Sequence, residues 1–180
     1  MQDLIKNGVQ TYASAGTFEA LEIGNVQGKG NILKAGEIKR IGNFKVIPFD
    51  VKHDCQEPLG FFINHPETGN ILFATDTKMI KYNFQNLKHV IIEANYSEEI
   101  VKNNFNYVNR RVINTHFSFE NCMNYLKKQD LNQVENIILI HLSDRNSDEQ
   151  RFIQQGSETL NKPVKVASNG AEYNFNKIPF

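Results

Sequence analysis

Three apolar segments of this chain each end at a side chain that can bind a metal ion or transfer a proton. The segments are "ILFAT", "VII" and "IILI", and they lead directly into Asp76, Glu93 and His141. Short continuous apolar runs are typical of strands that are buried on both faces. Sites in α/β sheets gather where the carboxyl ends of neighbouring strands meet. The pattern therefore predicts that these three side chains converge if the strands are neighbours in one sheet.

The surrounding sequence supplies the other strands of a mixed α/β fold. The apolar "GFFI" and "NILFAT" flank "HPETGN", which is a hairpin signal. Pro48 predicts an edge position or a bulge, because proline cannot donate a hydrogen bond to a sheet. Alternating or apolar character predicts strands over residues 9–14, 38–51 with a break at Asn43, 60–63, 70–75, 89–94 and 134–140.

Helices are expected mainly in the second half of the chain. Ser118 is a candidate N-cap, and the apolar positions after it predict a core-facing stripe over 118–128. Ser147 is a second candidate cap, followed by acids that suit the positive end of a helix dipole. Asn169-Gly170, between "VKVAS" and "AEYNF", predicts a final hairpin.

Length and charge limit the classes of function. The chain has 180 residues, which fits one domain over residues 1–180. Lys plus Arg and Asp plus Glu each number 20, so the net charge is zero. A zero balance gives no electrostatic case for a broad nucleic-acid or membrane surface, although it leaves a local basic patch open. No stretch approaches about 18 consecutive apolar residues, so we expect no membrane span.

Cysteine usage and overall composition indicate the compartment and the source. Cys55 and Cys122 lie far apart and form no CxxC pair, and we expect no signal peptide. We therefore expect reduced thiols in a cytoplasmic protein. Abundant Asn and Lys with no Trp suit an AT-rich genome, such as that of a low-GC bacterium or its phage.

Two further histidines extend the candidate site. His53, next to Asp54, follows a fourth strand, and His116 precedes the helix that Ser118 caps. His and Asp are suitable ligands for Zn²⁺, Mn²⁺ or Fe. A lone His at a strand end is more often an ordinary polar residue, and Asp54 is as well explained by a turn as by a role in orienting His53. From the residues alone, a metal site, an acid–base site and a set of solvated residues all stay open.

These segments resemble the metallo-β-lactamase fold superfamily, in particular its ribonuclease Z and YycJ-like phosphodiesterase branch. "FDVKHDCQEPLGFFI" is similar to the segment with the third-motif metal histidine, "ILFATDTK" to that with the bridging aspartate, and "ILIHLS" to the last ligand segment. "VIIEAN" and "NTHFSFENC" resemble segments that assist proton transfer. The resemblance implies metal ligands at His53, Asp76 and His141 and catalytic residues at Asp76, Glu93 and His116.

The resemblance also implies a reaction, namely metal-dependent hydrolysis of a phosphodiester with Zn or Mn. Asp76 would bridge two metals, while His53 and His141 would hold one each. His116, oriented by Glu93, would protonate the leaving oxygen. General acid assistance of this kind contributes about 10²–10⁴-fold to a rate.

The chain departs from the pattern of that family in one respect. The signature HxHxDH, which supplies most ligands of the first metal, does not occur in it, and His53 is its first histidine. In the family this signature lies upstream of a helix like residues 1–8. We therefore expect an αββα sandwich that is incomplete at its N-terminus, with an incomplete metal site. The chain would be a truncated product, one half of a split enzyme, or a degenerate member, with a homo-oligomer or a missing N-terminal segment as its partner.

Three functions fit these observations. The first is a metal-dependent hydrolase of phosphodiester bonds, either a nuclease or a cyclic-nucleotide phosphodiesterase, and the neutral charge favours a small substrate over a long polyanion. The second is a catalytically degenerate module that binds a nucleotide or a protein. The third is a structural subunit whose function does not depend on His53 or His141.

Overall fold

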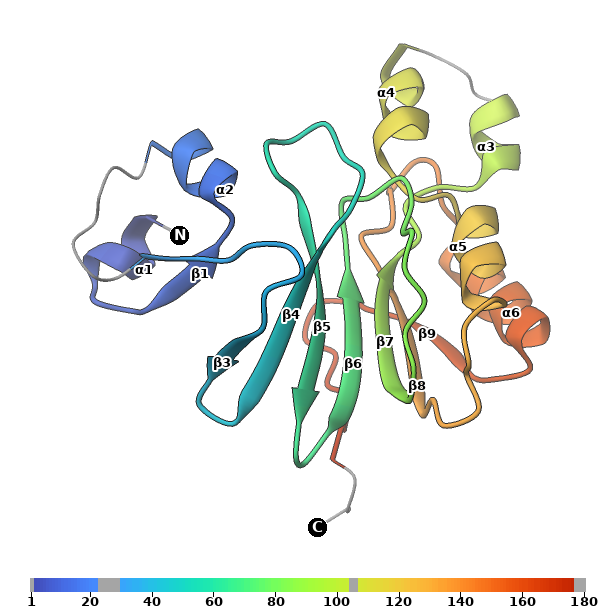
Figure 1. Ribbon diagram of the computed structural model, residues 1–180. Coiled ribbons are helices and arrows are strands. Elements are labelled where there is room, and N and C mark those ends of the chain that lie inside the picture. The colour runs from blue at the N-terminus through green and yellow to red at the C-terminus, as the bar shows by residue number, and fades with distance from the viewer. Residues whose placement is uncertain (1, 23–29, 104–106, 177–180) are drawn as a thin grey trace.

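The computed structural model describes residues 2–22, 30–103 and 107–176 (Figure 1). Its main feature is a seven-stranded sheet with the order β3-β4-β5-β6-β7-β8-β9. These strands are β3 (Lys39–Ile41), β4 (Phe44–Asp50), β5 (Leu59–His65), β6 (Gly69–Ala74), β7 (Leu87–Glu93), β8 (Asn136–Ile140) and β9 (Val164–Val166).

The direction of the strands decides where a site can form. Strands β3 to β6 pair antiparallel, whereas β6 to β9 pair parallel. Two antiparallel steps make β4 run in the same direction as β6. The carboxyl ends of β4, β6, β7 and β8 therefore lie at one edge of the sheet, which confirms the predicted convergence.

Helices cover one face of this sheet and one of its edges. Figure 1 shows α5 (Phe119–Leu126) and α6 (Glu149–Leu160) beside the parallel half of the sheet, whereas α3 (Glu98–Asn103) and α4 (Tyr107–Thr115) lie above its carboxyl edge. A smaller unit lies beside β4. It consists of α1 (Gln2–Lys6), α2 (Ala15–Ala20) and the parallel pair of β1 (Thr11–Ala13) and β2 (Gly30–Ile32). No helix in the described ranges is long and apolar enough to span a bilayer.

The core explains why α5 and α6 pack on the sheet. Strands β6 to β8 direct fully buried aliphatic side chains, such as Leu72 and Ile92, toward the helices. The rings of Phe119 on α5 and Phe152 on α6 stack with their centroids 4.3 Å apart. Each fully buried side chain of this size contributes about 1.5–3 kcal/mol to stability. The predicted stripe over 118–128 is therefore part of the core.

Several local predictions are confirmed. The Oγ atom of Ser118 accepts a hydrogen bond from the N–H of Asn121, as an N-cap does. Strands β5 and β6 form the predicted hairpin, and the chain turns between β3 and β4 around Asn43. Pro48 lies beyond the short span of β4 that pairs with β3, and its carbonyl instead accepts a hydrogen bond from the Gly36 N–H at 2.8 Å.

Two local predictions are wrong, and α3 and α4 were not predicted. The cap of α6 is Asp148 rather than Ser147, because Asp148 Oδ1 accepts from Arg151 N–H. The final hairpin does not form, since residues 171–176 make no strand. Instead, residues 171–176 form a tail without strand structure. Its Tyr173 hydroxyl donates to the Val166 carbonyl at 2.9 Å, and the tail then crosses the sheet to β7.

This tail is held by His89, a buried side chain inside β7. The Phe175 ring stacks on the imidazole with centroids 4.3 Å apart. The Asn136 amide donates to His89 Nδ1 at 3.0 Å, so His89 Nε2 donates to the Phe175 carbonyl at 3.1 Å. A neutral imidazole thus satisfies both partners. Burial lowers the pKa of His89, although the Phe175 carbonyl and Glu135 act in the opposite direction.

The stability of the protein should depend on pH through His89. The folded protein binds a proton there less readily than the unfolded chain, whose histidine pKa is about 6.5. This contribution is fully present above about pH 6.5 and is lost as the pH falls below it toward the folded pKa. Urea unfolding between about pH 7.5 and about pH 5 should show a smaller loss of unfolding free energy in His89→Leu than in the wild type. Parallel pH curves for the two proteins would contradict this account.

Candidate metal and acid–base site

The loops that follow β4 and β6 are tied to each other by backbone hydrogen bonds. The N–H of Lys78 donates to the carbonyl of Lys52 at 2.7 Å, and the N–H of Lys52 donates to Thr77 Oγ1 at 3.2 Å. His53 and Asp76 are therefore brought together by contacts that do not depend on their own side chains.

Asn95, just after β7, connects the loop that contains His116 and Phe117 to the loop after β8 that begins at His141. Its N–H donates to the Phe117 carbonyl at 2.8 Å, and its side-chain amide donates to the His141 carbonyl at 2.7 Å. The segment after β7 thus positions both His116 and His141. Four of the residues predicted for the site lie on these four loops, and the fifth, Glu93, is the last residue of β7.

The centre of the site is the carboxylate of Glu93, which is completely buried. Its Oε1 atom lies 2.6 Å from His116 Nδ1 and 2.9 Å from His141 Nδ1, while Oε2 accepts from the Thr77 N–H at 2.8 Å. An ionised carboxylate only accepts hydrogen bonds, so both imidazoles carry their proton on Nδ1. In a neutral ring the Nε2 lone pair is then available to a metal or a substrate, whereas in a protonated ring Nε2 carries a proton that can be donated.

Glu93 also tunes the acidity of His116. The hydrogen bond to Glu93 raises the pKa of His116 above its usual value, and burial offsets part of this rise. A raised pKa keeps more of the imidazole protonated near neutral pH. This suits a general acid, whose pKa should lie near the working pH.

His53 is largely buried, and its Nε2 atom has no hydrogen-bond partner among the described residues. Asp76 Oδ1 lies 3.8 Å from this nitrogen, which is too far for a hydrogen bond. Metal bonds of about 2.1 Å allow two ligand atoms of one ion to lie up to about 4.2 Å apart. A divalent cation therefore fits this pair, and it would satisfy a buried nitrogen that is otherwise unpaired.

The other ring nitrogen of His53 faces two neighbours. Asp54 Oδ1 lies 3.2 Å from Nδ1 and can accept its proton, which leaves Nε2 free to bind a metal. The Cys55 N–H, 3.1 Å from the same nitrogen, favours the opposite tautomer. Arg111 on α4 holds Asp54 with two hydrogen bonds and lowers the pKa of that carboxyl group. Metal binding at Nε2 would favour the proton on Nδ1, facing Asp54.

Asp76 and His141 both have left-handed backbones, with φ of 49° and 58°. Few residues other than glycine adopt this region, although Asp, Asn and His do so more often than most. Such conformations persist where the surrounding structure enforces them, often at functional sites. Here the two left-handed residues lie where the chain leaves a strand, Asp76 after β6 and His141 after β8. His141 Nδ1 lies 3.6 Å from Asp76 Oδ1.

The structure groups the candidate ligands differently from the sequence-based set. One group that could hold an ion is His53, Asp76 and His116, and a second is Glu93, His116 and His141. We interpret the second group as hydrogen-bonded, because distances of 2.6 and 2.9 Å from Glu93 to the two imidazoles are typical of hydrogen bonds. His116 thus stands beside His53 and Asp76, where the sequence placed only His141.

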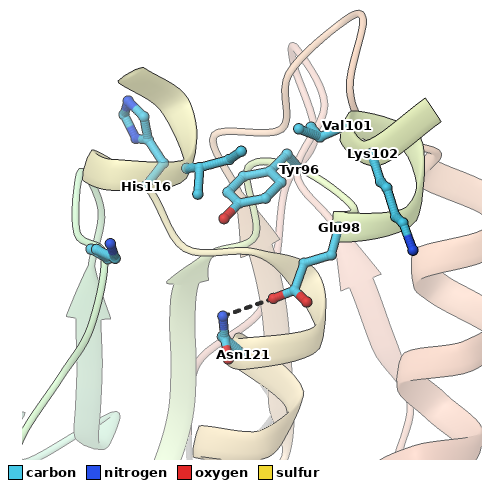
Figure 2. Close-up of a pocket in the computed structure, with 8 residues that line it drawn as sticks. Tyr96, Glu98, Val101, Lys102, His116 and Asn121 are labelled. Carbon is cyan, nitrogen blue, oxygen red and sulfur yellow. Dashed lines mark hydrogen bonds between the residues drawn. The ribbon is translucent and has the colours of Figure 1, made fainter. Parts of the chain in front are cut away.

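A pocket opens next to His116, with a cavity volume of about 460 Å³ (Figure 2). Figure 2 shows Tyr96 between His116 on one side and Glu98, Val101 and Lys102 on the other. The residues that line the pocket are Lys78, Tyr96, Glu98, Val101, Lys102, Ile113, His116 and Asn121. Sequence reasoning missed all of them except His116. Ser97-Glu98-Glu99 was the available signal, since Ser followed by acids often starts a helix.

No family model and no curated protein matches the sequence of this chain. Solved structures do match its fold. The metallo hydrolase Igni18 from the hyperthermophilic archaeon Ignicoccus hospitalis is 14% identical, with a TM-score of 0.61 over 96% of this chain and 73% of that one. The metallo-β-lactamase fold protein YhfI from Bacillus subtilis is 11% identical, with a TM-score of 0.63 over 89% of this chain and 62% of that one.

A third similar structure is a diphosphatase from the PhnP family. It is 15% identical, with a TM-score of 0.62 over 97% of this chain and 66% of that one. The chain therefore spans between 62% and 73% of the length of these three structures. Together with the mixed α/β sheet, these similarities show that the chain has the metallo-β-lactamase fold.

Proposed function

We propose that this chain is a metal-dependent hydrolase of phosphodiester bonds, of the ribonuclease Z and YycJ-like kind. The observation that carries the proposal is the unpaired, buried Nε2 of His53, which lies 3.8 Å from Asp76 and beside two imidazoles that share Glu93. Metallo hydrolases and a diphosphatase among the proteins of similar fold support it.

His53, Asp76 and His141 would hold a zinc or manganese ion, since Asp76 Oδ1 lies 3.8 Å from His53 Nε2 and 3.6 Å from His141 Nδ1. A bound divalent ion would polarise a phosphoryl oxygen and lower the pKa of a bound water. His116 would donate a proton to the leaving oxygen, since its pKa is raised and it lines the pocket. Glu93 would then stabilise the imidazole orientation that this transfer needs.

The surroundings of the site suit an anion that carries a substituent on each side. Lys78 and Asn121 line the pocket of Figure 2 and also a second cavity of about 490 Å³. Lys81 and Lys128 line that second cavity, and the described residues around it include no acid. A phosphodiester has one negative charge and two substituents, so it could place its phosphate near Lys78 and extend in both directions.

Metal titration with bis(4-nitrophenyl) phosphate tests this proposal. We expect turnover that appears with Mn²⁺ or Zn²⁺, disappears with a chelator, and is lost in His53→Ala and His141→Ala. Surface variants such as Lys127→Ala serve as controls and should keep it. Absence of metal-dependent turnover, even when an upstream HxHxDH segment is supplied, would contradict the proposal.

The second candidate is a catalytically degenerate module that binds a nucleotide or a protein. The missing HxHxDH signature favours it, because the described site has too few ligands for two metals. Such a module would bind its partner with a chelator present and would show no turnover. Loss of binding on chelation would count against it.

A further inference from the structure

The pocket beside His116 changes in chemical character along its length (Figure 2). His116 and Lys78 lie at the end next to the candidate metal site. The aromatic ring of Tyr96 lies in the middle, and the aliphatic Val101 and Ile113 also line the pocket. The far end carries Glu98, Lys102 and Asn121. A planar ring with polar edge groups fits such a space better than an alkyl chain or a fully charged group.

The carboxylate of Glu98 is held in place before any ligand arrives. Its Oε1 atom accepts hydrogen bonds from the Ser118 hydroxyl at 2.8 Å and from the Asn121 amide at 2.9 Å. Among the hydrogen bonds within the described residues, none engages Glu98 Oε2 or Asn121 Oδ1. The far end of the pocket therefore offers two oxygen acceptors, one charged and one neutral, on side chains that already fix each other.

We infer that this pocket binds a nucleobase with an exocyclic amino group, and that Glu98 determines this specificity. The inference rests on the proposed function, which places a phosphate of the same substrate near His116 and Lys78. An amino group has two N–H donors, one for Glu98 Oε2 and one for Asn121 Oδ1. A base with a carbonyl at that position would place an acceptor against both oxygens, which leaves the exposed Lys102 as its donor at this end, and unpaired polar groups in a pocket are costly.

Paired nucleotides test this inference without a metal. CMP and UMP differ in the amino or carbonyl group at one ring position and in the proton on the ring nitrogen beside it, and so do AMP and IMP. Calorimetric titration with a chelator present should show CMP binding about ten- to a hundredfold more tightly than UMP, and AMP more tightly than IMP by a similar factor. Equal affinities within both pairs, or no binding of any of the four nucleotides, would overturn the inference.

The variant Glu98→Gln separates recognition from structural support. Gln can keep accepting from Ser118 and Asn121 through its oxygen, and it then presents an NH₂ group to the ligand. Because Asn121 Oδ1 remains an acceptor, we expect the preference for CMP and AMP to be lost or to reverse toward UMP and IMP. The matched control is Glu99→Gln on the same helix, since Glu99 pairs with Arg151 and does not line the pocket. An unchanged preference for amino bases in Glu98→Gln would overturn the inference.

The two proposals fail separately, because bis(4-nitrophenyl) phosphate carries no nucleobase. Metal-dependent turnover of that compound, together with equal nucleotide affinities, would overturn the base pocket and leave the hydrolase. A preference for amino bases that is lost or reverses in Glu98→Gln, without any turnover, would support the pocket and argue against the hydrolase.

Discussion

Asp76→Asn should abolish metal-dependent hydrolysis while leaving the fold intact. Asn adopts the left-handed backbone that this position requires, and the side chain is half-exposed, so the expected change in stability is within about 0.5 kcal/mol. The loss of charge is the main effect. Metal-derived stabilisation of a transition state is worth several kcal/mol, so turnover of bis(4-nitrophenyl) phosphate should fall about a thousandfold or more.

Asp54→Asn is the matched control for this change. Asp54 is also an acid beside His53, but it bonds Arg111 and faces the opposite ring nitrogen from Asp76. An orienting carboxylate of this kind typically contributes about 10–100-fold to metal affinity or activity, so its effect should be clearly smaller. Thermal unfolding of both variants would confirm that they are folded. Wild-type metal affinity and turnover in Asp76→Asn would contradict the role assigned to Asp76.

The convergence of the site residues could be predicted from the sequence because four of them lie at or just beyond the carboxyl ends of strands. A buried apolar run has a recognisable pattern, and parallel neighbours direct their carboxyl ends to one edge. Asp76, Glu93 and His141 follow from these two facts alone. The sequence did not predict that His116 and His141 both contact Oε1 of Glu93, because this contact depends on the angle at which two loops approach the carboxylate.

The pocket could not be predicted in this way. Tyr96, Glu98 and Asn121 lie in segments that come together only in the folded chain, and α3 and α4 lack a long apolar period. The prediction of a final hairpin was wrong for a related reason. Asn169-Gly170 is a strong local turn signal, but the stacking of Phe175 on His89 carries the tail elsewhere. Tertiary contacts thus outweighed local preference in both places.

Glu93→Gln should weaken metal binding and the fold together. If the amide oxygen faces the two imidazoles, the NH₂ group meets the Thr77 N–H, and in the other orientation the imidazoles lose their acceptor. A buried donor left without a partner costs about 1–3 kcal/mol of unfolding free energy. Because His141 loses its orienting carboxylate, metal affinity measured by competition with a chelating dye should fall about 10–100-fold.

His116→Ala is the variant to compare with Glu93→Gln, because it separates proton donation from metal binding. It removes the proposed acid and leaves Glu93 paired with His141, so turnover should fall about 10²–10⁴-fold while metal affinity stays near that of the wild type. A large loss of metal affinity in His116→Ala would instead make His116 a metal ligand, as its position near His53 and Asp76 allows. Because Glu93 and His116 act as a unit, the double variant should lose less than the product of the two single losses.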